Sequence, residues 1–196
     1  MAFSRQRIVA VLGLCLGAVA IGAVSLGMGF SQDNATASLD NTPEKPKAAP
    51  VKLGSSGLPL PRFVSLKRNK LNVRKGPSTD HRVMWIYTSK GYPVEVIAES
   101  DNWRRIRDAQ GEEGWVFHSL LSGSRTSLVA PWGEATQVPL LSEPHSGAPA
   151  VASLGSGVMG LINKCTGEWC MIGVPGFSGW IKQDQLWGVY PGEVLK

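Results

Sequence analysis

The chain has 196 residues, of which 43% are hydrophobic and 18% are charged. This composition excludes a wholly disordered protein and leaves room for two small domains with buried cores. The net charge of +5 is uneven: residues 62–125 carry twelve Lys and Arg against seven Asp and Glu, whereas residues 126–196 carry three against five. The first part therefore favours anionic partners, although such a charge run is also typical of a solvated surface.

The N-terminus has the pattern of an export signal or a membrane anchor. Arg5 and Arg7 precede an uncharged apolar run over residues 8–30, and the Ala-Thr-Ala sequence of residues 35–37 matches a signal-peptidase site. The apolar run is also long enough to span a bilayer. We predict that residues 1–37 are a signal peptide, with an uncleaved anchor as the alternative. Either places the rest of the chain in the periplasm or another extracytoplasmic compartment.

Residues 38–60 are predicted to be a flexible linker. They are rich in Pro, Lys, Ala, Gly and Ser, and their four prolines, with Pro61 directly after them, break any helix or strand ladder. The prolines favour extended conformers, so this segment is a spacer before the folded part of the chain.

Residues 61–125 are predicted to form a small module of short strands joined by local turns. Aromatic and β-branched residues alternate with polar ones, and Gly, Pro, Asn and Asp mark the turns. Strands are expected at residues 63–66, 71–74, 83–87, 92–98, 103–107 and 114–117. Short strands linked in this way indicate an antiparallel barrel. Trp103 and Ile106 do not fit strict alternation, so we expect a bend, a bulge or a strand end there.

The landmarks of this module recur about 66 positions later in the chain. Trp169 and Ile172 repeat the Trp-x-x-Ile spacing, and Gly179-Trp180 repeats Gly114-Trp115. Residues 126–196 are therefore expected to be a second, divergent copy of the same fold.

The repeated residues resemble the pattern of bacterial SH3-like domains. That family has an early L-N-V-R-x-G-P-S segment, a central W-x-x-V/I and a late G-x-x-G-W-V, matched here by residues 71–78, 103–106 and 111–116. The resemblance implies an all-β protein with two tandem SH3-like antiparallel β-barrels, at residues 61–125 and 126–196. It also implies binding rather than catalysis, commonly in envelope proteins, with peptidoglycan or its peptide stems as the ligand.

We expect most of the repeated Trp and Gly residues to build the barrels rather than to contact a ligand. A small barrel must be filled by side chains, and a glycine such as Gly76 or Gly114 provides backbone freedom. The structural landmarks are Gly76, Trp103, Gly114, Trp115, Trp169, Gly179 and Trp180.

Ligand contact is predicted for a polar pair and three aromatic residues of the first copy. Asn72 and Arg74 could engage amides and carboxylates of a peptide or glycan, beside Trp85, Tyr87 and Tyr92. At Arg74 the alternative is an arginine that fixes its own loop.

Cys165 and Cys170 are predicted to form a disulfide across a hairpin of the second copy. The compartment is oxidising, the exported part contains an even number of cysteines, and a four-residue turn can bring paired positions within bonding distance. We expect no metal site, since His145 is the only histidine of that copy. No cofactor is indicated.

An enzyme is disfavoured because the two modules, linker and signal leave no room for a catalytic domain, and no nucleophile motif surrounds the histidines. Two binding functions remain. The first is attachment to a cell-wall glycan or peptide, and the second is an envelope adaptor that binds a segment of a partner protein. Nucleic acid is disfavoured by export. A membrane is expected to be contacted only through an uncleaved N-terminal segment.

Overall fold

The computed structural model describes residues 52–133 and 137–196, which form two larger antiparallel sheets and one short hairpin. The predicted signal peptide and residues 38–51 of the predicted linker lie outside the described residues. In the part of the chain that is described, no helix combines the length and apolar character needed to cross a membrane.

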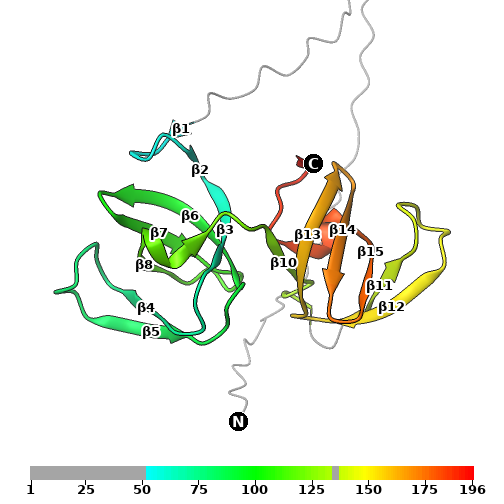
Figure 1. The fold of residues 1–196 in the computed structure, drawn as a ribbon, viewed down its shortest axis with the longest axis horizontal. Coiled ribbons are helices and arrows are strands. Elements are labelled where there is room, and N and C mark those ends of the chain that lie inside the picture. The colour runs from blue at the N-terminus through cyan, green and yellow to red at the C-terminus, as the bar shows by residue number, and fades with distance from the viewer. Residues whose placement is uncertain (1–51, 134–136) are drawn as a thin grey trace, which may run out of the picture. The chain divides into compact units, whose positions relative to one another are not determined.

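The first sheet has seven strands in the order β5-β4-β8-β7-β6-β3-β9 (Figure 1). Its bounds are β3 (Arg62–Leu66), β4 (Leu71–Arg74), β5 (Val83–Tyr87), β6 (Pro93–Ser100), β7 (Trp103–Arg107), β8 (Glu113–Phe117) and β9 (Leu121–Ser122), with the 3-10 turn η1 (His118–Leu120) before β9. Along each strand, the side chain of every second residue points inward. The core is filled by small branched residues, among them Val73, Val94, Val96, Ile106 and Val116, each with no exposed surface.

The second sheet repeats this order with its own strands, β12-β11-β15-β14-β13-β10-β16. Its bounds are β10 (Thr126–Val129), β11 (Gln137–Leu141), β12 (Ala150–Gly155), β13 (Met159–Thr166), β14 (Trp169–Val174), β15 (Phe177–Lys182) and β16 (Leu186–Trp187), with η2 (Gln183–Gln185) before β16. An additional strand, β17 (Val194–Leu195), pairs with β13. The predicted all-β fold of two tandem barrels is confirmed.

The irregular Trp-x-x-Ile spacing has the same explanation in both barrels. Trp103 is the first residue of β7 and lies on the opposite face from the buried Ile106. The strand itself is regular, and the bulge lies on its neighbour β6, between Val96 and Ala98. In the second barrel Trp169 begins β14, and β13 carries the bulge. The strand-end alternative is therefore the one that the structure shows.

The end of the predicted linker is structured, which corrects the expected boundary at residue 60. Residues 52–60 form a hairpin of β1 (Lys52–Leu53) and β2 (Pro59–Leu60). The hairpin is held by Glu99 on β6, whose carboxylate accepts hydrogen bonds from the backbone N–H of Ser56 at 2.7 Å and from its hydroxyl at 2.8 Å. A Cβ at Gly54 would collide with this carboxylate, so a larger residue there would have to displace the end of the Glu99 side chain. These long-range contacts are not visible in the composition of the segment.

Residues of the two barrels also contact each other directly. The Phe63 ring lies 4.7 Å from the ring of Tyr190 and 5.1 Å from that of Trp187, measured between centroids. The Tyr190 hydroxyl donates a 2.9 Å hydrogen bond to Glu95, which also accepts from Arg107. Burial and the Glu95 carboxylate raise the pKa of Tyr190, so the phenol stays protonated and keeps donating.

Candidate functional site

The first barrel has an open pocket of about 390 Å³ beside β4. Its walls come from β4, the loop after it, the start of β7, the end of β8 and η1. The lining residues combine two cations, an amide and an aromatic pair: Lys70, Leu71, Asn72, Arg74, Thr79, Trp103, Phe117 and Leu120. Two of the residues predicted to bind a ligand, Asn72 and Arg74, therefore lie in one pocket.

Strand β4 divides its side chains between the core and this pocket. Leu71 and Val73 are buried, whereas Asn72 is exposed. The Arg74 guanidinium donates from Nη1 to the carbonyl oxygens of Thr79, at 2.8 Å, and of His81, at 2.7 Å. Arg74 thus fixes the loop that follows β4, which was the alternative for this residue, and it also remains part of the pocket wall.

Trp103 and Phe117 form the aromatic side of the pocket. They are directly paired across β7 and β8, and their rings meet edge to face with centroids 5.5 Å apart. Both rings are only partly buried. Trp103 therefore has a packing role, as expected, and also offers part of its indole to the pocket.

The other three residues predicted to contact a ligand lie elsewhere. Trp85 and Tyr87 pair with Val73 and Leu71, so they share the face of the ladder that packs against the core, not the face of Asn72. Tyr92 stacks on Tyr87 at 5.3 Å between centroids. The Tyr87 hydroxyl donates to Asp108 at 2.8 Å, and burial together with that carboxylate raises the pKa of Tyr87. The structure does not bring these aromatic residues to the pocket.

Close approach, rather than the expected backbone freedom, explains the landmark Gly114, whereas Gly76 meets a less severe constraint. Neither has a positive φ. A Cβ on Gly114 would collide with Val73 of the core, whereas one on Gly76 would meet only the ring of the exposed His81, which can move aside. Gly179 has the same role as Gly114 in the second barrel, because its Cβ would lie 2.6 Å from the carbonyl oxygen of Leu141. Trp115 and Trp180 are half-buried, and Trp169 is buried.

The second barrel has a pocket of about 270 Å³ at the equivalent place, with different chemistry. The strand register defines which positions are equivalent. Arg74 pairs with Trp115 in the first barrel, and Leu141 pairs with Trp180 in the second. Likewise, Trp103 pairs with Phe117, and Trp169 pairs with Lys182. The positions of Lys70, Asn72 and Arg74 are taken by Gln137, Pro139 and Leu141. Leu141 packs with Ala148 and Trp169 in a small apolar cluster. The two cations of the first pocket, Lys70 and Arg74, are therefore replaced by uncharged residues, and Lys182 is the one cationic residue that lines the second pocket.

Comparison with protein families assigns the repeated module. The model described as "Bacterial SH3 domain" matches residues 67–123 and 134–188. The chain belongs to the bacterial SH3 domain family. No curated protein matches the chain.

Solved structures similar to this SH3 protein include two described as NlpC2 and NlpC1 from Trichomonas vaginalis. NlpC2 is 18% identical over 65% of this chain, with a TM-score of 0.30. NlpC1 is 20% identical over 68% of this chain, with a TM-score of 0.31. The matched part spans 48% of each of those chains. The tandem SH3 protein thus corresponds to about half the length of either.

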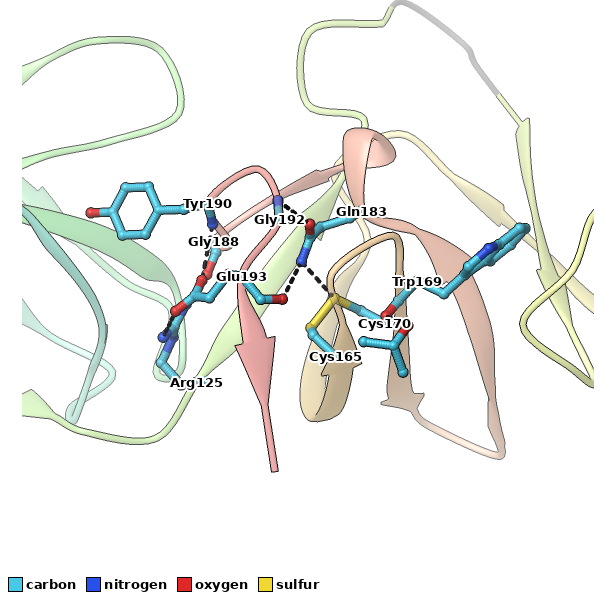
Figure 2. The surroundings of a disulfide bond; sticks show 10 residues. Arg125, Cys165, Trp169, Cys170, Gln183, Gly188, Tyr190, Gly192 and Glu193 are labelled. Atoms are coloured by element: carbon cyan, nitrogen blue, oxygen red, sulfur yellow. Dashed lines mark hydrogen bonds and ion pairs between the residues drawn. A yellow bond between two sulfur atoms is a disulfide. The ribbon is translucent and has the colours of Figure 1, made fainter. Parts of the chain in front are cut away.

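The predicted disulfide is present in the second SH3 domain. Cys165 and Cys170 are bonded and pair directly across β13 and β14, and neither is exposed to solvent. Figure 2 shows the amide of Gln183 beside the Cys170 sulfur, 3.7 Å away, with the indole of Trp169 pointing away from the bond. Among the described residues, no group of three or more His, Cys, Asp or Glu could hold a metal ion.

The first SH3 domain closes the equivalent hairpin with an ion pair. Glu99 and Arg104 occupy the paired positions that Cys165 and Cys170 occupy in the second domain. The Arg104 Nε lies 3.0 Å from the Glu99 carboxylate, and Arg62 donates to the same carboxylate at 2.7 Å. Burial alone would raise the pKa of Glu99, but the bonds from Ser56 and Arg62 and the charge of Arg104 lower it to about 2. No sequence motif marked Glu99, although its alignment with Cys165 in the repeat was a usable signal.

Proposed function

We propose that this protein is a non-enzymatic binding protein of the bacterial cell envelope, and that its first SH3 domain binds peptidoglycan through the peptide stems. The observation that carries the proposal is the pocket that combines Lys70, Asn72 and Arg74 with the Trp103 indole. Peptide stems carry carboxylates and amides. Two cations favour the carboxylates, and an amide side chain can both donate to and accept from a peptide group.

The composition of the pocket supports binding rather than catalysis. None of its lining residues is a Cys, His, Asp or Glu, the side chains that most often serve as nucleophile, general acid or general base. An extracytoplasmic location is supported by the export pattern of residues 1–37 and by the disulfide, which persists in an oxidising compartment.

The proposal is tested by co-sedimentation of the purified protein with insoluble peptidoglycan at low and high salt. Lys70→Ala and Asn72→Ala are expected to weaken binding, about tenfold or more for Lys70, because a bond to a charged group contributes roughly 1.5–3 kcal/mol. Both side chains are exposed, so these substitutions spare the core. Binding by the unaltered protein is expected to fall as salt screens the charges.

Lys90→Ala is the matched control, since it removes the same charge from an exposed turn outside the pocket. If the protein does not pellet with peptidoglycan at low salt, the proposal fails. It also fails if Lys70→Ala and Lys90→Ala have equal effects.

A second candidate function is an envelope adaptor that binds a segment of a partner protein. The same pocket favours it, because an acidic peptide segment offers the same carboxylates and amides. Retention of one envelope protein by the immobilised chain, lost in Lys70→Ala and without peptidoglycan co-sedimentation, would support this function over the first.

A further inference from the structure

The second SH3 domain has another pocket, of about 500 Å³, at a place where the first domain does not carry the same residues. It lies between the tip of the β13–β14 hairpin, the start of η2 and the turn after β16. The side chains that give it chemical character are Trp132, Glu168, Lys182 and Asp184.

The fold itself does not require these side chains, because the first domain has other residues at the equivalent positions. The N–H of His118 donates to the carbonyl of Asn102 just as the N–H of Gln183 donates to that of Glu168, which makes the two hairpin tips equivalent. A second repeated bond, from Lys67 to Leu120 and from Ala130 to Gln185, aligns the loops after β3 and β10. On this alignment the first domain has three uncharged residues where the second has the indole and the two carboxylates: Asn69, Asn102 and Ser119.

The wall of this pocket formed by the turn after β16 is held in place by a buried amide. Gln183 is 6% exposed, and its Nε2 donates to the carbonyl of Glu193 while its Oε1 accepts from the N–H of Gly192, both at 2.8 Å (Figure 2). The Nε2 atom of the same amide also contacts the Cys170 sulfur of the disulfide. The turn at residues 188–193 is thereby tied to the hairpin, so the pocket is formed before any ligand arrives.

The chemistry of the pocket favours a neutral, hydroxyl-rich ligand. The Trp132 side chain is 60% exposed, which leaves an indole face free for the C–H face of a sugar ring. Glu168 and Asp184 are exposed carboxylates that can accept from hydroxyl groups, and Lys182 can donate to them. The two carboxylates disfavour an anionic ligand, and the charge of Lys182 offsets part of their attraction for a cationic one.

The position of Lys182 also indicates the length of the ligand. Its side chain lines this pocket and also the pocket beside Pro139, Leu141 and Trp169. The two pockets therefore share Lys182 as a common wall, and an extended ligand can occupy both.

We propose that the second SH3 domain binds a neutral glycan chain, with Trp132 stacking on one sugar ring and Glu168, Lys182 and Asp184 bonding to hydroxyls. The identification of this glycan with that of the cell wall rests on the proposed function, but the binding site itself does not. The two SH3 domains would then recognise the peptide and the glycan of one polymer.

The experiment is calorimetric titration of the full chain with a neutral trimer of β-1,4-linked N-acetylglucosamine. Trp132→Ala is expected to weaken binding at least about tenfold, and Trp132→Phe to restore part of it because an aromatic face remains. Asp184→Asn is expected to weaken binding several-fold. Phe177→Ala is the matched control, since this aromatic residue is 54% exposed and lies outside both pockets.

The failures of the two proposals are distinguishable. Lys70→Ala is expected to leave trimer binding unchanged, even if it abolishes co-sedimentation with peptidoglycan. Absence of trimer binding by the unaltered protein at about 10 mM overturns the glycan site. Equal binding by the Trp132→Ala and Phe177→Ala variants also overturns it. So does displacement of the trimer by lysine methyl ester, which would make the carboxylates a cation site.

Discussion

Glu99→Gln is expected to lower the free energy of unfolding by about 3 kcal/mol, because it leaves buried cations without their counter-charge. The Glu99 side chain is 1% exposed and its partners Arg62 and Arg104 are 17% and 10% exposed. A glutamine keeps the shape but loses the charge. It would also weaken the bonds that tie Ser56, and with it the 52–60 hairpin, to the first SH3 domain.

The same residue predicts a pH dependence of defined sign. The pKa of Glu99 falls from 4.5 in the unfolded chain to about 2 in the folded protein, so the carboxylate contributes stability that is fully present above pH 4.5. That stability is lost as the pH falls through the folded value, and amounts to about 3 kcal/mol for a shift of this size.

Urea unfolding at pH 7 and at pH 3 measures both effects. Glu112→Gln is the control, because Glu112 is exposed and its substitution removes the same charge. The Glu99→Gln variant is expected to lose less stability between the two pH values than the control. Equal stability of the two variants at pH 7 would contradict the counter-charge role.

Replacement of both Cys165 and Cys170 by Ala is expected to lower the free energy of unfolding by about 2 kcal/mol, the value for closing a small ring in the unfolded chain. Both cysteines are fully buried, and β13 also carries β17 at Cys165. The bond therefore holds a hairpin on which the C-terminal strand depends.

Thermal unfolding with and without dithiothreitol measures this contribution. The reductant is expected to lower the melting temperature of the unaltered protein and to leave the double Ala variant unchanged. Because the sulfurs are buried, reduction should require the hairpin to open and should therefore be slow below the transition. A reductant effect of equal size on the variant would show that the disulfide is not its cause.

The strands and the disulfide could be predicted because their signals are local. Turn residues and period-two alternation mark each strand, and the spacing of Cys165 and Cys170 fits a single hairpin. The same alternation explains the exposure of Asn72, since it lies between the buried Leu71 and Val73 and therefore on the opposite face of β4.

Two expectations were wrong for the same reason. Both the role of a landmark glycine and the position of the aromatic residues depend on how neighbouring strands pair. Trp85 and Tyr87 lie on the core side of the ladder because they pair directly with the buried Val73 and Leu71 of β4. The need for Gly114 likewise arises from Val73, a residue 41 positions earlier. Alternation along one strand gives its two faces but not which neighbour each face meets.

Glu99 was missed for the same reason. Its partners Ser56 and Arg62 lie 43 and 37 residues away, so no window of sequence contains the set. The place of Trp103 in a pocket wall was also missed, because the sequence favoured a packing role, and a half-buried ring can both pack and line a pocket.

Acid and reductant should therefore act on different halves of this protein, since one hairpin position is closed by a carboxylate in the first SH3 domain and by a covalent bond in the second. Acidification weakens the domain with the cationic pocket, and reduction weakens the domain with the Trp132 pocket. A tandem repeat with the same kind of bond at this hairpin position in both domains would lose stability in both domains under one condition. This protein is instead expected to keep one of its two SH3 domains closed under either stress.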